Sequence, residues 1–224
     1  MREQVIKSIE ENKIIVIVRG LERENLIPFA EAVYSGGMRL MELTYSADGS
    51  VSDEEIADRI KMLSEHFKGR MFIGAGTVLN EKQIELTKKA GGLFIISPDT
   101  YENVIKKTRE LGLVSIPGAF TPSEIQAAHR YGADFVKVFP LTVGGVSYLK
   151  AVKAPLSHIK LLAVAGITLE NFPEFLKEGA SGFGMGVNFM DKTLIAEGRF
   201  DKITEIAKEY AGAVKTETAK KREE

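Results

Sequence analysis

The sequence has no cysteine, and this absence excludes several kinds of chemistry. Without thiols the chain can form no disulfide, no thiolate metal site and no cysteine nucleophile. Its three histidines, His66, His129 and His158, are scattered over segments expected to be helical or loop, so neither a histidine metal triad nor a Ser-His-Asp arrangement is indicated. We therefore expect neither a metal nor a cofactor and interpret the histidines as surface or structural residues.

The sequence also lacks a strong charge of either sign and a long apolar run. The 30 basic residues nearly balance the 31 acidic ones, so no overall field favours nucleic acid or a membrane surface as a partner. No run approaches the roughly 18 apolar residues of a membrane-spanning helix. The N-terminal segment alternates charged and apolar residues at helical spacing, unlike a signal peptide. These features predict a cytoplasmic protein whose ligands are small molecules.

Short apolar runs recur at regular intervals and are typical of buried strands. The eight predicted strands cover residues 13–19, 39–45, 71–77, 93–98, 113–119, 135–140, 160–166 and 182–187. Amphipathic segments with helical spacing, N-cap candidates and terminal glycines lie between several of them, as in 24–37, 53–67, 80–92 and 168–181.

The alternation of strands and helices indicates an α/β protein with a parallel sheet. Eight such units fit a closed (β/α)₈ TIM barrel, with an extra N-terminal helix at the bottom of the barrel. We expect one domain over residues 1–215, because no linker divides the chain, followed by a charged tail over 216–224. An open doubly wound sheet is the alternative architecture.

Two charged residues interrupt the predicted strands. Side chains of a strand alternate between its two faces, so Lys137 points away from the face of Val136 and Val138. Those valines suit the helix-covered outside of a barrel, which places the lysine inside. By the same alternation Glu42 faces the interior. Because functional residues of such barrels lie near the C-terminal ends of the strands, we expect both side chains in one pocket.

A buried lysine beside a carboxylate is suited to Schiff-base chemistry. Burial lowers the pKa of a lysine, which leaves neutral amine that can attack a carbonyl carbon. The resulting iminium accepts electrons when a neighbouring C–C bond breaks, and a carboxylate such as Glu42 can move the protons. The alternative is that Lys137 and Glu42 form a buried ion pair that only holds strands together.

Several other strand ends carry candidate binding groups. Arg19 either binds a ligand carboxylate or forms a rim salt bridge. The glycines of GAGTV (74–78) either allow close approach of a substrate or serve packing. Segments 164–168 and 184–188 end the last two predicted strands, where barrels often bind phosphate through backbone N–H groups.

An ordered series of motifs resembles the 2-keto-3-deoxy-6-phosphogluconate (KDPG) and 4-hydroxy-2-oxoglutarate (KHG) aldolase family. The motifs run from about residue 13 to 210 and include VIVRG, LMELT, GAGTVLN, ISPDT, IPGAFTPSE, VKVFP, AGIT and GMGVN. The resemblance implies a class I aldolase of sugar-acid metabolism of the Entner-Doudoroff type, acting without a metal as a homotrimer. Lys137 would form the Schiff base with pyruvate, and Glu42 would transfer protons through a water.

The resemblance also implies a set of substrate-binding residues. Thr77 and Arg19 would hold the carboxylate, Phe139 would pack beside the keto acid, Pro98 would shape the pocket wall, and Pro117 would position a loop. The remaining implied residues, at the ends of the last two predicted strands, are Val164, Ala165, Gly166, Gly186 and Asn188.

Three departures from the family pattern concern the substrate. Ser46 stands where many relatives have a carboxylate-binding arginine. Val164-Ala165 replaces Thr-Gly, and Val187-Asn188 replaces Gly-Ser, so the phosphate site is altered. Valine at position 164 also occurs in some relatives that act on the galactonate-derived epimer (KDPGal). KDPG, KDPGal and the unphosphorylated KHG therefore all stay open as substrates.

Two other functions compete with a lyase. The barrel could bind a sugar phosphate or serve as an assembly subunit without catalysis, with Lys137 a structural cation. It could also be a sugar-phosphate isomerase or epimerase that does not need Lys137.

Overall fold

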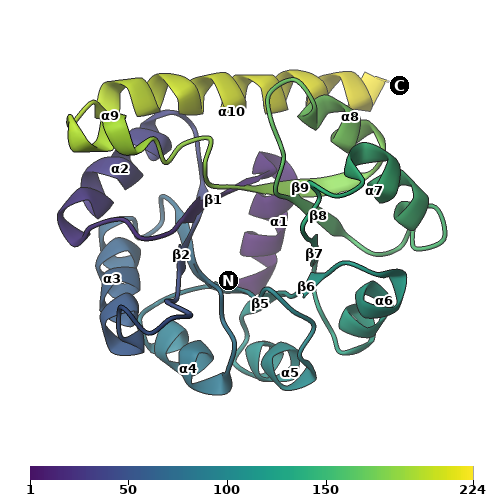
Figure 1. The fold of residues 1–224 in the computed structure, drawn as a ribbon, viewed down its shortest axis with the longest axis horizontal. Helices are drawn as coiled ribbons and strands as arrows, with labels where there is room; N and C mark the ends of the chain where they lie inside the picture. The colour runs from purple at the N-terminus through teal and green to yellow at the C-terminus, as the bar shows by residue number, and fades with distance from the viewer. Residues whose placement is uncertain (224) are drawn as a thin grey trace.

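The computed structural model describes residues 1–223, and within this range ten helices and nine strands alternate along the chain (Figure 1). The strands are β1 (Ile14–Val18), β2 (Leu40–Thr44), β3 (Phe72–Gly76), β4 (Phe94–Ile96), β5 (Val114–Ile116), β6 (Gly118–Ala119), β7 (Val136–Val138), β8 (Leu161–Val164) and β9 (Ala180–Met185). The helices are α1 (Arg2–Asn12), α2 (Arg23–Ser35), α3 (Asp53–His66), α4 (Glu81–Lys89), α5 (Glu102–Glu110), α6 (Pro122–Arg130), α7 (Gly145–Lys153), α8 (Phe172–Lys177), α9 (Lys192–Ala196) and α10 (Phe200–Glu223).

The nine strands form one sheet in which neighbouring strands pair in parallel. Their order is β5-β4-β3-β2-β1-β9-β8-β7-β6. The two ends of this order, β5 and β6, are consecutive in the chain and separated only by Pro117, so the sheet curls into a nearly closed barrel (Figure 1). The predicted α/β fold with a parallel barrel is confirmed, and the open doubly wound alternative is wrong.

The predicted strand over residues 113–119 is two short strands in the structure. Pro117 has no backbone N–H to donate to a neighbouring strand, so it interrupts the ladder. β5 pairs with β4 before the proline, and β6 pairs with β7 after it. The interruption lies where the ring closes.

The starts of several helices are fixed by side chains that accept backbone hydrogen bonds. The Ser52 hydroxyl accepts from the Glu55 N–H at the start of α3. Asn80 accepts from the Gln83 N–H at the start of α4. At the start of α6, Thr121 forms a reciprocal capping box with a glutamate three residues later. These caps set where each strand-to-helix loop ends.

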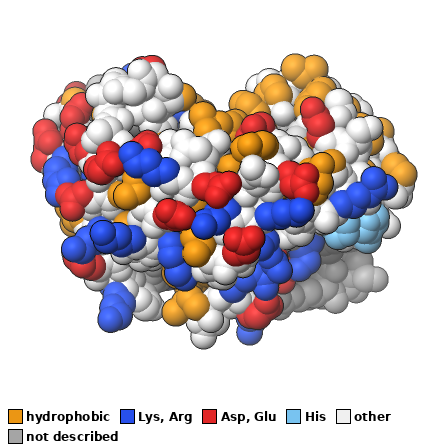
Figure 2. Space-filling model, turned by 90° about the horizontal axis from the view of Figure 1, so that it is seen from below, with side chains coloured by type: hydrophobic (Ala, Val, Ile, Leu, Met, Phe, Trp, Pro, Cys, Tyr) orange, Lys and Arg blue, Asp and Glu red, His pale blue; other side chains and the backbone are white. Residues whose placement is uncertain are grey.

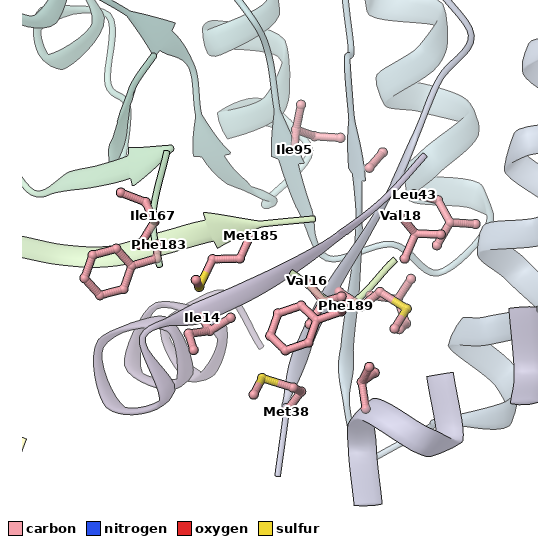
Figure 3. Packing of buried hydrophobic residues seen from close by; sticks show 14 of the residues in the cluster. Ile14, Val16, Val18, Met38, Leu43, Ile95, Ile167, Phe183, Met185 and Phe189 are labelled. Carbon is pink, nitrogen blue, oxygen red and sulfur yellow. The ribbon is translucent and has the colours of Figure 1, made fainter. Parts of the chain in front are cut away.

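Most of the core lies between the strands and the surrounding helices. β1 contributes Ile14, Val16 and Val18 to this outer layer, where they pack near Met185 and Phe189 (Figure 3). All five side chains are nearly fully buried. Burial of an apolar side chain of this size contributes about 1.5–3 kcal/mol, so this layer is the main stabilising element of the barrel.

A second, smaller core fills the inside of the barrel at the N-terminal ends of the strands. Val5 and Ile9 of α1 are completely buried there and pack with inward-facing residues. These residues are Ile15, Leu40, Phe94, Ile96, Val114, Ile116 and Leu162 of the strands and Phe135, directly before β7. α1 therefore closes this end of the barrel, as the sequence predicted.

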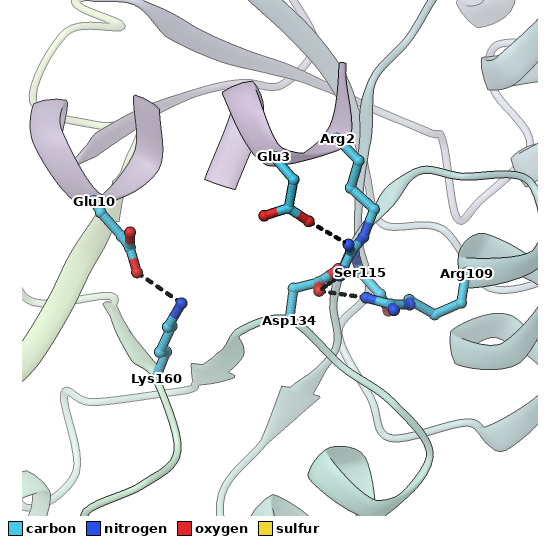
Figure 4. A network of polar contacts seen from close by, with 7 residues as sticks. All are labelled: Arg2, Glu3, Glu10, Arg109, Ser115, Asp134 and Lys160. Carbon is cyan, nitrogen blue, oxygen red and sulfur yellow. Dashed lines mark hydrogen bonds and ion pairs between the residues drawn. The ribbon is translucent and has the colours of Figure 1, made fainter. Parts of the chain in front are cut away.

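Polar contacts hold both ends of α1 against the barrel (Figure 4). Near its start, Arg2 forms an ion pair with Asp134, which also accepts from the Ser115 N–H at 3.0 Å and pairs with Arg109. Near its end, a second ion pair joins Glu10 to Lys160 at 2.7 Å. The helix is thus tied to two separate strand connections.

The last helix, α10, packs along α2 and continues through the segment predicted as a charged tail. Residues 216–223 are helical, and residue 224 lies outside the described residues. Gly36, just after α2, is needed for this packing, because a Cβ atom there would clash with Ala207 of α10. Across residues 1–223, no helix combines the length and the apolar character needed to span a bilayer.

The face of the molecule formed by α4 and α5 carries side chains of both charge signs. Figure 2 shows basic and acidic side chains interspersed over the face formed by α4 and α5. This pattern agrees with the nearly equal numbers of basic and acidic residues in the sequence.

Candidate active site

Lys137 lies on β7 and points into the barrel. Its neighbours Val136 and Val138 are buried in the outer layer, against the helices, so the alternation of the strand turns the lysine inward. The lysine Nζ lies 4.6 Å from the centroid of the Phe139 ring. Burial lowers the pKa of the Lys137 ammonium below its ordinary value, against the opposing effect of Glu42, and Arg19 lowers it further. The amine is therefore easier to deprotonate than an exposed lysine.

Glu42 lies on β2 and is only 2% exposed. Its carboxylate lies against Gly76 at the end of β3: a Cβ atom added to that glycine would come within 2.5 Å of Glu42 Oε2. Within residues 1–223 this oxygen is buried and has no hydrogen-bond partner. Burial raises the pKa of Glu42 to about 7, with Lys137 and then Arg19 acting in the opposite direction. A carboxyl with this pKa can both accept and donate a proton near neutral pH.

Lys137 and Glu42 come from opposite sides of the barrel. Between β2 and β7 the sheet order contains β1, β9 and β8 on one side. Each side chain acts electrostatically on the other, yet the structure places no ion pair between them within residues 1–223. A structural ion pair that only holds the strands together would need a direct contact between Lys137 and Glu42, and the described structure does not contain it.

Arg19 and Thr77 meet at the C-terminal rim of the barrel. The Arg19 Nη2 donates to Thr77 Oγ1 at 2.8 Å. Thr77 has a φ of 55°, an uncommon left-handed conformation for a β-branched residue. Arg19 is exposed, and along the described chain it forms this hydrogen bond and no ion pair, so of the two alternatives for Arg19 the rim salt bridge is not present. Its guanidinium is available to a carboxylate.

The predicted proline positions lie at the closing point of the barrel. The Pro117 carbonyl accepts from the Lys137 N–H at 2.8 Å, which fixes the backbone of the lysine. Gly118 pairs with Lys137, and a Cβ atom there would clash with the Pro98 carbonyl. The loop after β4 can therefore approach β6 only because position 118 is glycine.

The ends of β8 and β9 are held together by Asn188. Its side-chain amide donates to the Ile167 carbonyl at 3.0 Å and to the Tyr210 hydroxyl at 2.7 Å. Both amide hydrogens are thus directed at protein atoms. Val187 beside it is 91% exposed.

Backbone conformation shapes the same rim at the end of β8. Val164 is buried, while Ala165 and Gly166 have φ values of 74° and 76°. Gly186, at the end of β9, runs close to β1, since a Cβ atom there would lie 3.1 Å from the Ile17 carbonyl oxygen. The loops after β8 and β9 therefore lie close together. Their hydrogen-bond donors differ from those that the Thr-Gly and Gly-Ser pattern would offer to a phosphate.

Comparison with known proteins gives the family. A family model described as KDPG and KHG aldolase matches residues 5–206. The chain belongs to the KDPG and KHG aldolase family. The resemblance seen in the ordered motifs is thereby confirmed.

Individual members of the KDPG and KHG aldolase family are similar along nearly the whole chain. The 2-dehydro-3-deoxy-phosphogluconate aldolase of Haemophilus influenzae is 27% identical over 214 residues, 95% of this chain and 98% of that protein. The 2-dehydro-3-deoxy-6-phosphogalactonate aldolase of Escherichia coli is 28% identical, over 90% of this chain and 96% of that protein.

A solved structure of the family is also similar. The KDPG aldolase of Legionella pneumophila, with pyruvate captured as a covalent carbinolamine, has a TM-score of 0.81 and 25% identity, covering 91% of this chain and 96% of that chain. The fold is therefore shared with an aldolase whose substrate is held covalently.

Ser46 stands where the sequence resemblance implies an arginine, and its hydroxyl forms local hydrogen bonds. Its Oγ donates to Asp48 Oδ1 at 2.5 Å and lies 2.9 Å from Ser50 Oγ. Hydrogen bonds from Ser46 and Ser50 lower the pKa of Asp48 to about 2, so the loop after β2 carries a fixed negative charge.

Two contributions to the site were missed in the sequence. The fit of the Glu42 carboxylate against Gly76 was not foreseen, although the glycine-rich motif was a signal for a close approach. The stacked pair Phe120 and Tyr148, with ring centroids 4.7 Å apart, was also missed. The Tyr148 hydroxyl donates to the Phe120 carbonyl, so the pair ties the loop after β6 to α7. An aromatic residue directly after a strand end was the available signal.

The three histidines lie apart from Lys137 and Glu42. His66 contacts Glu31 at 2.6 Å on the surface, and the His129 and His158 rings pack edge to face. In the described part of the chain, His, Asp and Glu form no group of three or more that could hold a metal ion. Within the described residues, folding therefore brings together no candidate metal ligands beyond those considered from the sequence.

Proposed function

We propose that this protein is a class I aldolase that cleaves a 2-keto-3-deoxy-6-phospho sugar acid or 4-hydroxy-2-oxoglutarate to pyruvate and an aldehyde. One observation carries the proposal: a half-buried lysine whose pKa is lowered shares the barrel interior with a buried glutamate whose pKa is raised to about 7. A pair of groups with oppositely displaced pKa values is suited to nucleophilic and acid–base roles at neutral pH.

The reaction begins at Lys137. Its neutral amine attacks the C2 carbonyl carbon of the keto acid, and the carbinolamine loses water to give an iminium. Glu42, as the carboxylate, takes the proton of the C4 hydroxyl directly or through a water. The C3–C4 bond then breaks, its electrons move to the iminium nitrogen, and the aldehyde leaves. The enamine takes a proton at C3 from Glu42, and hydrolysis releases pyruvate and restores the amine.

The other predicted residues have supporting roles in this proposal. Arg19 and Thr77 bind the substrate carboxylate, with Arg19 supplying the positive charge that Ser46 does not. Phe139 packs beside the bound keto acid, because its ring already lies next to the Lys137 amine. Pro98 and Pro117 shape the wall through the contacts around Gly118.

The aldehyde end of the substrate is bound by the rim of β8 and β9, formed by Val164, Ala165, Gly166, Gly186 and Asn188. The side-chain NH₂ group of Asn188 already donates to Ile167 and Tyr210. Only its side-chain carbonyl oxygen and its backbone are therefore left to contact the substrate. Comparing kcat/KM for KDPG, KDPGal and 4-hydroxy-2-oxoglutarate determines which aldehyde this rim accepts. A rim that binds phosphate favours KDPG and KDPGal, and a rim that has lost phosphate binding favours the unphosphorylated 4-hydroxy-2-oxoglutarate.

Borohydride reduction in the presence of pyruvate tests the proposal. We expect one reduced pyruvate adduct, located on Lys137 by mass spectrometry, and no adduct in Lys137→Ala. Lys160→Ala is the matched control, because Lys160 also lies over a phenylalanine ring but at the other end of the barrel. Absence of an adduct in the wild type would favour a binding or assembly barrel. Full turnover by Lys137→Ala would favour an isomerase or epimerase.

The proposal extends to architecture, assembly and location. Counting β5 and β6 as one strand interrupted at Pro117 gives the eight strands of a (β/α)₈ TIM barrel with an extra N-terminal helix. We infer a homotrimer, supported by exposed apolar side chains at the rim such as Tyr101 and Val143. Light scattering should give three times the chain mass, and cell fractionation should place the enzyme in the cytoplasm.

A further inference from the structure

A large cavity lies at the N-terminal end of the barrel, away from Lys137 and Glu42. Its volume is about 760 Å³, and it lies between α1, the C-terminal ends of α3 and α4, and the starts of β3 and β4. We name it the basal cavity and define it by six of its lining residues, Lys61, Ser64, Lys68, Met71, Lys89 and Leu93. Small-molecule sites in proteins commonly measure about 300–1,000 Å³, so this volume suits an organic ligand.

The basal cavity combines an apolar floor with a basic edge. Met71 is buried, and Leu93, just before β4, is half-buried. Lysines 61, 68 and 89 surround this floor, and within residues 1–223 neither Lys68 nor Lys89 has an ion-pair partner. Lys61 has only a long contact of 3.9 Å to Glu65. Glu65 itself also lines the cavity, so two cations, Lys68 and Lys89, remain uncompensated there. Together with the apolar floor they are complementary to an anion that has an apolar body.

Ser64 also lines the basal cavity, but its hydroxyl is not available to a ligand. Its Oγ is fully enclosed, and it lacks a hydrogen-bond partner in the part of the chain that the structure describes. A buried hydroxyl without a partner is unfavourable, because it loses its hydrogen bonds to water. The enclosed oxygen is out of reach of a ligand in the basal cavity, so the binding site consists of the lysines and the apolar floor.

We propose that the basal cavity is a second binding site, for a small organic anion with an apolar body. The anionic group contacts Lys89 and Lys68, and the body covers Met71 and Leu93. This site is separate from the proposed aldolase chemistry and does not depend on it, since α1 and the inner core lie between the two ends of the barrel.

The lysines have a competing structural explanation, which a matched pair of variants tests. Lys88 and Lys89 both lie in the last turn of α4, where a cation is favourable to the helix dipole, but only Lys89 lines the cavity. Lys88→Glu and Lys89→Glu therefore change the net charge and the helix end equally. Only the second changes the cavity.

The probe is 8-anilinonaphthalene-1-sulfonate, an anion with an aromatic body, titrated by fluorescence at low salt into the full chain. We expect saturable binding that Lys89→Glu weakens by about 10-fold, as for loss of a charge-assisted contact, and that Lys88→Glu changes by less than about 2-fold. No binding, or equal effects of the two variants, would overturn the proposal.

Methyl NMR locates the probe independently of affinity. With ¹³C-methyl methionine, the probe should shift the signal of Met71 in the cavity and leave that of Met185, at the far end of β9, unchanged. A shift confined to Met185 would place the probe at the other end of the barrel and contradict the basal site.

Discussion

The Glu42 carboxylate occupies the space that a side chain at Gly76 would take. A Cβ atom on Gly76 would lie 2.5 Å from Oε2 and 2.7 Å from Oε1 of Glu42. The end of β3 therefore sets the position of an acid that lies on β2.

Gly76→Ala should displace the carboxylate while leaving the fold intact. The clash is with the end of a flexible side chain and not with backbone, so the glutamate can move. We expect kcat to fall by about 10- to 100-fold, as for a misplaced catalytic group, with the borohydride adduct retained. Gly212→Ala in α10, where a Cβ atom meets nothing within 4 Å, is the control and should keep full activity.

Glu42→Gln should separate adduct formation from turnover. The amide cannot exchange protons, so turnover should slow by about 10²- to 10⁴-fold, typical of lost general acid–base catalysis. Lys137 remains, so pyruvate should still be trapped by borohydride. A glutamine variant as fast as the wild type would show that Glu42 does not transfer protons.

The pH dependence of activity should report Glu42. The proposed cleavage needs the carboxylate form, and burial raises the pKa of this group to about 7. We expect kcat/KM to fall as the pH drops through about 7. Lys137 must also lose its proton, and this lowers kcat/KM in acid in both proteins, so in Glu42→Gln the fall through about pH 7 should become less steep. An unchanged slope would show that Lys137 or another group causes all of it.

The same group should make stability depend on pH. Its folded-state pKa of about 7 exceeds the ordinary 4.5, so between these values the folded protein binds more protons than the unfolded chain. The free energy of unfolding should therefore fall by up to about 3 kcal/mol as pH rises from 4.5 to 7. Urea denaturation across this range should show a smaller fall in Glu42→Gln, which has no charge to bury.

Arg19→Ala should weaken binding of the substrate carboxylate. We expect KM to rise by about 10- to 100-fold, the range for loss of a charge-assisted hydrogen bond. Arg19 also lowers the pKa of both Glu42 and Lys137, so its removal should move the acidic limb of kcat/KM to higher pH. Arg23→Ala, which loses only an exposed pair with Asp58, is the control. Equal effects of the two variants would argue against a binding role for Arg19.

Chelation should leave the proposed reaction unchanged. The iminium on Lys137 accepts the electrons of the broken bond, so the chemistry does not call for a Lewis acid. We expect equal kcat before and after dialysis against EDTA. Activity that is lost and then restored by a divalent ion would contradict this mechanism.

The sequence predicted the barrel because its strands have a strong local signal. The apolar runs around Lys137 and Glu42 gave strand positions within about two residues, and alternation alone turned both side chains inward. The break at Pro117 was not predicted, although proline was visible, because pairing on each side depends on different neighbours.

The site was less predictable where contacts join distant parts of the chain. Asn188 donates to Tyr210, 22 residues away, and this bond depends on where α10 packs. The basal cavity likewise arises from three separate segments that share no motif. Its lysines have ordinary helical spacing in the sequence and gave no signal.

The helix that fills the N-terminal end of the barrel has a kinetic consequence. With α1 tied down by Arg2 and Glu10, the N-terminal end of the barrel is closed, so the route to Lys137 and Glu42 is at the C-terminal end. Both products must leave through that end, and pyruvate is still bonded to Lys137 when the aldehyde forms. Departure should therefore be sequential, with the aldehyde first and the keto acid second.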